Sequence, residues 1–100
     1  DRSSAASDVY KRQEYDETAG TLRLTQESTM TYASAQKFGG EVYKDDLSLE
    51  SYLDIVGVIS YDVRSACGLQ ELTVTLEGVS SDGQTIYTVS SDGTITSCWQ

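Results

Sequence analysis

The second half of the chain alternates between apolar and polar positions, which is typical of β-strands with one buried face. Four segments show this pattern, namely residues 58–63, 72–77, 84–90 and 94–99. In the clearest of them, Leu72, Val74 and Leu76 alternate with threonine and glutamate. The last two joints both read SSDG, and Asp-Gly between two strand-like segments is a strong hairpin signal. The pattern therefore predicts a four-stranded antiparallel meander.

The first half follows a helical period instead. In residues 14–38, apolar residues recur at steps compatible with one helical face, namely Tyr15, Ala19, Leu22, Met30 and Ala33. Acidic residues gather at the start of this segment, Lys37 lies near its end, and Gly39-Gly40 follow it. Both features are typical of helix ends, so we expect a long amphipathic helix here.

A second, shorter helix is expected at residues 47–55. Leu49, Tyr52, Leu53 and Val56 have helical spacing, Ser48 or Asp46 is placed to cap the start, and Gly57 to end it. The predicted fold class is α+β, with the N-terminal amphipathic helix packed on the four-stranded antiparallel sheet. In this arrangement Leu22, Met30 and Ala33 of the helix would pack against the strand residues Leu72, Val74 and Leu76.

The composition of the chain argues against several classes of function. One hundred residues suit one small domain, and the net charge of −9 disfavours binding to nucleic acid or to an anionic membrane. The longest apolar run, residues 55–59, is too short to span a bilayer. The chain has no histidine, which removes the Ser-His-Asp triad. We therefore expect no enzymatic activity and no cofactor.

Two cysteines, Cys67 and Cys98, flank the β-rich segment. We expect them to form one disulfide that ties the last strand to the sheet, which would imply periplasm, cell surface or secretion. The alternative is a pair of free thiols. Asp82 and Asp92, in the two SSDG joints, are weak candidates for a calcium site. Turn chemistry explains the same two residues without a metal.

Several short motifs resemble type IV pilins and the related pseudopilins. Residues 20–40 contain Gly20-Thr21-Leu22-Arg23 and Thr31-Tyr32-Ala33-Ser34 and close with a glycine pair, as the helix of these proteins does. The pattern Y-x-V-x-x-D-G-x-I follows, in Tyr87, Val89, Asp92, Gly93 and Ile95. The Cys67/Cys98 pair is similar to the disulfide-bounded loop of many pilins. The apolar N-terminal helix of the family is not present here.

This resemblance implies a non-enzymatic structural subunit of a bacterial surface filament or secretion pseudopilus, with identical or homologous pilin subunits as partners. It implies no membrane contact by residues 14–100 themselves and a membrane-anchored parent protein before assembly. The alternative is a small secreted binding module, adhesin-like or effector-like, that uses Tyr43, Tyr52 and Tyr61 for contacts. Those rings would otherwise complete a lean core.

Residues 1–13 differ from the rest of the chain, because they hold three of its seven basic residues. Three interpretations are a basic arm, a dibasic processing site at Lys11-Arg12, and a segment foreign to the natural protein. Ser3–Gln13 resembles a translated sequencing-adapter read-through joined to a truncated reading frame, as found in metagenomic sequences. We therefore expect residues 1–13 to be a non-native leader and residues 14–100 to be the pilin-like domain.

Overall fold

The computed structural model describes residues 12–99, and these begin with a β-hairpin. Strand β1 (Arg12–Asp16) pairs antiparallel with β2 (Thr21–Glu27), which places Tyr15 opposite Leu22. The chain reverses at Gly20, whose N–H donates to the Asp16 carbonyl over 2.9 Å. Gly20 has a φ of 66°, a conformation that glycine adopts without steric cost. The hairpin therefore follows from a turn sequence between two strands.

The predicted helix over residues 14–38 is wrong. Only its last part is helical, in α2 (Tyr32–Val42), which runs through Gly39-Gly40 instead of stopping before them. The predicted helical face did not include Leu24. This residue is 3% exposed and alternates with polar neighbours along β2. β-Branched threonines also favour the strand there. On α2 itself Ala33 is exposed, and Ala35 is the buried alanine.

The longest helix of the structure covers a segment in which a short helix and then a strand were predicted. A short 3-10 helix, η1 (Asp45–Leu47), leads into α3 (Leu49–Cys67), so the expected end at Gly57 and the strand at 58–63 are both wrong. The alternation of apolar and polar residues over 58–63 is short and fits a helix as well as a strand. Ser48 does cap the start, since its hydroxyl accepts a hydrogen bond from the Ser51 N–H, and Gly68 follows the last turn.

The last three strands form the predicted hairpins. Strand β3 (Thr73–Val79) pairs antiparallel with β4 (Thr85–Ser90), and β4 with β5 (Ile95–Ser97). In each SSDG turn the glycine has a positive φ and its N–H donates to the first-serine carbonyl three residues earlier. This part of the antiparallel prediction is confirmed.

The sheet as a whole is mixed, with five strands in the order β1-β2-β3-β4-β5. Strands β2 and β3 run parallel. Helices α2 and α3 lie between them in the chain and return it to the end of the sheet at which β2 begins. The prediction of a four-stranded antiparallel sheet under an N-terminal helix, in the manner of pilins, is therefore wrong.

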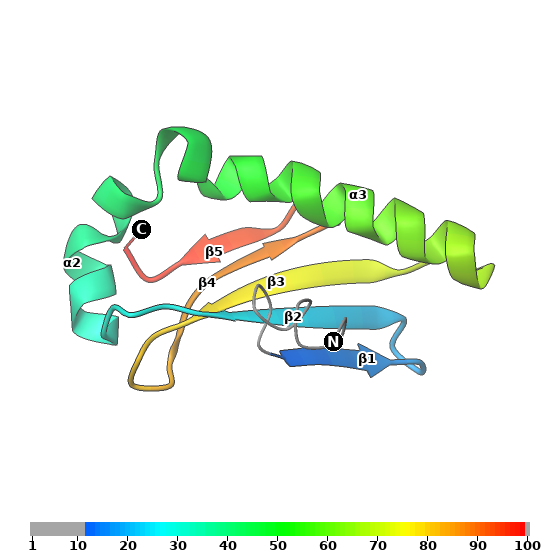
Figure 1. Cartoon of the computed structure of the whole chain (residues 1–100), viewed down its shortest axis with the longest axis horizontal. Helices are drawn as coiled ribbons and strands as arrows, with labels where there is room; N and C mark the ends of the chain where they lie inside the picture. The colour runs from blue at the N-terminus through cyan, green and yellow to red at the C-terminus, as the bar shows by residue number, and fades with distance from the viewer. Residues whose placement is uncertain (1–11, 100) are drawn as a thin grey trace, which may run out of the picture.

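Helices cover one face of this sheet (Figure 1). Helix α3 lies along β3 and β4, and α2 packs at the end of β4. The core lies between the two layers and consists of Leu24, Ala35, Leu49, Val56, Leu72, Val74, Leu76, Ile86, Tyr87 and Val89. Leu22 and Met30 pack at its margin. Within residues 12–99 no helix combines the length and apolarity needed to cross a bilayer.

The predicted Cys67–Cys98 disulfide is wrong. Cys67 is the last residue of α3, and Cys98 directly follows β5. The end of α3 and the end of β5 lie at opposite ends of the molecule (Figure 1). Both cysteines are free thiols, and a disulfide requires Cα atoms within about 7 Å. The inference of an oxidising compartment loses this support, and a periplasmic or surface location stays a prediction.

The leader predicted at residues 1–13 lies outside the described residues except for its last two positions. Arg12 and Gln13 belong to β1 and pair with Thr25 and Leu24 of β2. The end of that segment therefore forms the start of the edge strand β1.

Candidate functional site

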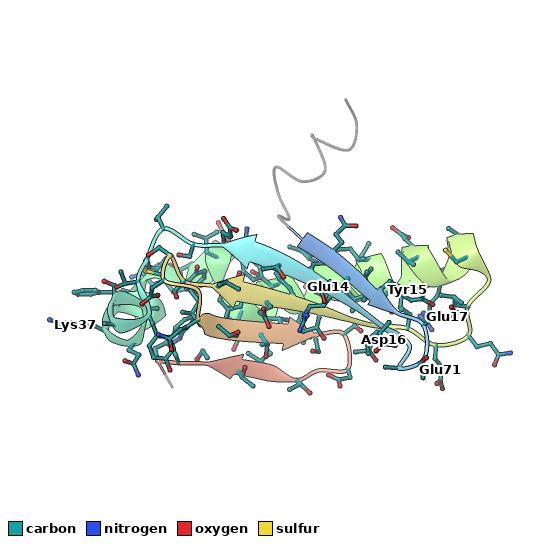
Figure 2. All side chains as sticks on the ribbon, turned by 90° about the horizontal axis from the view of Figure 1, so that it is seen from below. Glu14, Tyr15, Asp16, Glu17, Lys37 and Glu71 are labelled. Atoms are coloured by element: carbon teal, nitrogen blue, oxygen red, sulfur yellow. The ribbon has the colours of Figure 1, made fainter. Side chains whose placement is uncertain are left out.

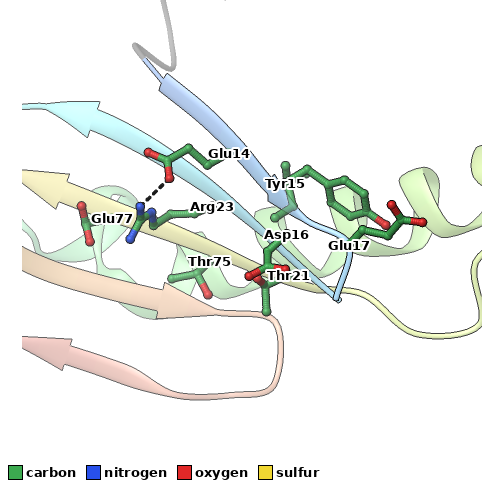
Figure 3. Close-up of a pocket in the computed structure, with 9 residues that line it drawn as sticks. Glu14, Tyr15, Asp16, Glu17, Thr21, Arg23, Thr75 and Glu77 are labelled. Atoms are coloured by element: carbon green, nitrogen blue, oxygen red, sulfur yellow. Dashed lines mark hydrogen bonds and ion pairs between the residues drawn. The ribbon is translucent and has the colours of Figure 1, made fainter. Parts of the chain in front are cut away.

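A hollow of about 680 Å³ lies on the sheet face opposite the helices, at the edge formed by β1, β2 and β3. Figure 2 views the molecule from this side, and Figure 3 shows the hollow itself. It is lined by Glu14, Tyr15, Asp16, Glu17, Thr21, Leu22, Arg23, Thr75 and Glu77. Polar side chains predominate because successive strand residues alternate between faces, and the apolar set turns towards the helices.

One guanidinium occupies the middle of this hollow. The strand register places Glu14 opposite Arg23, and their side chains form an ion pair of 2.7 Å between Oε2 and Nη2. Glu77 lies on the other side of the guanidinium (Figure 3). Arg23 and Glu14 are about half exposed, at 47% and 52%, and exposed pairs of this kind contribute about 0–1 kcal/mol.

Two pairs of hydroxyl side chains on the open face hydrogen-bond to each other across neighbouring strands. Thr75 and Ser90 share a hydrogen bond of 2.7 Å, and Thr88 and Thr96 share one of 2.6 Å. The carboxylates around Arg23 give the hollow an excess of negative charge in contact with water. These features are typical of a solvated sheet face, and Tyr15, 51% exposed, is the large exposed ring beside the hollow.

The outer face of α3 has the opposite character. Three large apolar side chains, Ile55, Val58 and Tyr61, are 43%, 60% and 65% exposed at successive helical turns. A depression of about 280 Å³ lies beside the first two of them and is lined by Asp54, Ile55, Val58 and Ile59. Apolar side chains gathered in this way mark an interaction surface more often than scattered ones do.

The sequence of α3 explains this face. Its inner side, with Leu49, Val56 and Ser60, is buried against the sheet. Ser60 completes the fit, since its hydroxyl donates to the Leu72 carbonyl over 2.7 Å. Because one layer of sheet covers only one side, apolar residues at other positions of the helix remain at the surface. The helix is thus apolar on more of its circumference than its own fold uses.

The tyrosines proposed as a contact surface separate into two groups. Tyr61 is on the surface, whereas Tyr43 and Tyr52 are half-buried against Tyr87, at ring distances of 5.1 and 6.0 Å. Trp99 stacks on Tyr43 with its ring plane 3° from parallel. Burial raises the pKa of Tyr43, although a hydrogen bond with Ser28 opposes this. These rings close one end of the core.

The two calcium candidates lie in separate turns at the two ends of β4. The Asp92 carboxylate accepts from the Thr94 N–H over 3.0 Å within its own turn. The Asp82 carboxylate accepts from the Ser80 hydroxyl and, over 3.0 Å, from the Tyr32 N–H. In the described part of the chain, no three Cys, Asp or Glu side chains gather as a metal site. The structure shows both aspartates engaged in turn and cap hydrogen bonds.

Sequence reasoning missed Ile55 and Val58 as surface residues. It placed Val58 in a strand, where an apolar residue is assigned to one face of a sheet. A helical reading of residues 49–67 would have found apolar residues on both sides of the helix. That excess is the signal that identifies the outer face.

Comparisons of this chain with protein-family models, with curated proteins and with solved structures find no match. The surfaces of the chain itself therefore provide the basis for a functional proposal.

Proposed function

We propose that this chain is a non-enzymatic protein-binding module that docks its partner on the outer face of α3. The observation that carries the proposal is the row of Ile55, Val58 and Tyr61, each exposed by 43% or more on one helix. Full burial of such a side chain contributes about 1.5–3 kcal/mol. A partner that covers the row therefore gains most of its affinity from three residues.

The fold favours this use because the helix is presented rigidly. Ser48 caps its first turn, and Leu49, Val56 and Ser60 fix it to the sheet along its length. A preorganised surface loses little conformational entropy on binding, so more of the contact energy appears as affinity.

Assembly into a filament, the other function predicted from the sequence, is not supported in the same way. The residues that carry the resemblance to pilins, 20–40, form a strand and a separate helix rather than one continuous helix. We therefore propose the binding module.

The proposal is tested by selecting peptides from a random library on the whole chain and measuring their affinities for variants. The double variant V58S/Y61S removes two exposed apolar side chains from α3. The matched control F38S/V42S removes two from α2, where Phe38 and Val42 are 49% and 42% exposed. We expect about a tenfold loss of affinity on V58S/Y61S only.

Selected peptides that bind V58S/Y61S as tightly as the unchanged chain would contradict the proposal. Circular dichroism of both variants checks that the fold is retained, which we expect because all four positions are at the surface.

A further inference from the structure

We propose that the partner of α3 presents apolar side chains flanked by lysine or arginine, and that it is neither a second copy of this chain nor a lipid surface. This inference rests on the proposed function and identifies the chemistry of the partner. It is carried by the charges that surround the apolar row.

The charges nearest Val58 are negative. Glu50, Asp54 and Asp62 are exposed residues of α3, and Asp54 and Asp62 lie four positions before and after Val58. Residues four apart are neighbours on one helix face, so both carboxylates flank the valine. Asp54 also lines the apolar depression.

The basic residue of α3 does not balance them. Arg64 follows Tyr61 by three positions, but its guanidinium is engaged by backbone carbonyls. Its Nε donates to the Ser60 carbonyl over 3.3 Å, and its Nη1 donates to the Gln70 carbonyl, beyond the end of the helix, over 3.4 Å. The surface around Val58 is therefore apolar with an acidic margin, and a complementary surface has a basic margin.

A second copy is disfavoured by the same charges. Antiparallel packing of two α3 helices centred on Val58 would bring Asp54 of one copy towards Asp62 of the other. Parallel packing would bring each aspartate towards its own counterpart. Like charges face each other in both arrangements, and the net charge of −9 on each copy adds to the repulsion. Anionic lipid head groups are repelled for the same reason.

The spacing of the row describes the partner further. Ile55 and Tyr61 are six residues apart, which is about 9 Å along the helix axis. An amphipathic helix laid along α3 matches that length with two or three of its own apolar residues. Tyr61, the most exposed of the three, is a residue type enriched among binding hot spots.

The test uses two synthetic amphipathic helical peptides with the same leucine face, one flanked by lysines and the other by glutamates at the same positions. Their dissociation constants are measured by calorimetry with the whole chain. We expect the lysine peptide to bind at least about tenfold more tightly than the glutamate peptide.

Three variants locate the interaction. V58S/Y61S and D54N/D62N should each weaken binding of the lysine peptide by about tenfold. The charge-matched control E17Q/E71Q removes two carboxylates from the loops beyond the sheet (Figure 2) and should change it by less than about twofold. An equal loss in the control would show general attraction to an acidic protein and would overturn the proposal.

The remaining outcomes separate this inference from the proposed function. Equal binding of both peptides, lost in V58S/Y61S, overturns the basic partner but leaves the binding module intact. Binding that does not depend on Val58 and Tyr61, or no binding of the lysine peptide, overturns the inference. A dimer in sedimentation that V58S/Y61S abolishes assigns the face to a second copy. If vesicles of phosphatidylcholine and phosphatidylglycerol bind the unchanged chain but not V58S/Y61S, the outer face of α3 is assigned to lipid binding.

Discussion

The carboxylate of Asp82, in the turn between β3 and β4, accepts a hydrogen bond of 3.0 Å from the backbone N–H of Tyr32, the first residue of α2. The two residues are fifty positions apart in the sequence. A negative charge at a helix start is favourable because it satisfies a free N–H and opposes the helix dipole. Asp82 therefore acts as a cap supplied from a distant turn, in addition to the cap by Thr31.

This contact predicts a pH-dependent stability. Hydrogen bonds from the Ser80 hydroxyl and then the Tyr32 N–H hold the pKa of Asp82 below its ordinary value of 3.8. A group with a lowered folded-state pKa stabilises the fold above its ordinary pKa, and this stability is lost as the pH falls through the folded value. Asp82→Asn should therefore be less stable than the unchanged chain at neutral pH, with a difference that closes below about pH 3.8.

Urea unfolding midpoints at several pH values measure this difference. Asp92→Asn is the matched control, because the pKa of Asp92 is also lowered but by Thr94 within its own turn. Only Asp82→Asn should speed hydrogen exchange at the Tyr32 amide. Equal exchange in the two variants would show that Asp82 does not cap α2.

Replacement of glycine by alanine should have opposite effects on stability at Gly57 and at Gly78. At Gly57 an added methyl group would meet no heavy atom within 4 Å beyond its chain neighbours and the backbone of its own helix, so Gly57→Ala should stabilise the helix by about 0.5–1 kcal/mol. At Gly78 it would lie 2.0 Å from the Tyr87 ring, so Gly78→Ala should destabilise by about 1–3 kcal/mol. Chemical denaturation gives both values. Destabilisation by Gly57→Ala would contradict a helix that continues through this residue.

Truncation to alanine should cost much more stability at a core residue than at an apolar residue on the surface. Leu76 is 3% exposed between sheet and helices, and Leu76→Ala should cost roughly 2–4 kcal/mol of unfolding free energy. Val58 is 60% exposed, and Val58→Ala should cost less than about 0.5 kcal/mol. A large loss at Val58 would mean that the outer face of α3 is part of the core and not free for a partner.

The strand predictions succeeded where local signals agree. Leu72, Val74 and Leu76 alternate with polar residues, and two Asp-Gly turns fix the pairing of the following strands. The same method failed at residues 14–38, because a handful of helically spaced apolar residues outweighed Leu24 and the turn at Gly20. The parallel pairing of β2 and β3 depends on long-range packing, which no local pattern records.

The exposed face of α3 was missed for a related reason. Treating Gly57 as a helix end divided α3 into a short helix and a strand, and the outer face with Ile55 and Val58 exists only on the continuous helix. Tyr61 was proposed as a contact residue from its type, and it is exposed. The disulfide failed because sequence spacing gives no information on distance, and the ends of α3 and β5, where Cys67 and Cys98 lie, are at opposite ends of the fold.

The separation of the cysteines predicts two titratable thiols in the folded chain without reductant. Burial raises the pKa of Cys98, which lowers the fraction of reactive thiolate at a given pH, whereas Cys67 is exposed at the end of α3. Cys67 should therefore react first with a thiol reagent, and Cys67→Ser should remove the faster phase. A folded, oxidised chain without free thiols would contradict this placement.

We propose that the outer face of α3 binds a partner segment that is apolar and flanked by basic residues. Amide chemical-shift mapping of the isotope-labelled chain, titrated with the lysine-flanked peptide, tests it most directly. We predict that the largest shifts fall on residues 54–62 of α3, with little change at Arg23, Thr75 and Glu77 on the opposite face. Shifts centred on that opposite face, with α3 unchanged, would contradict the account.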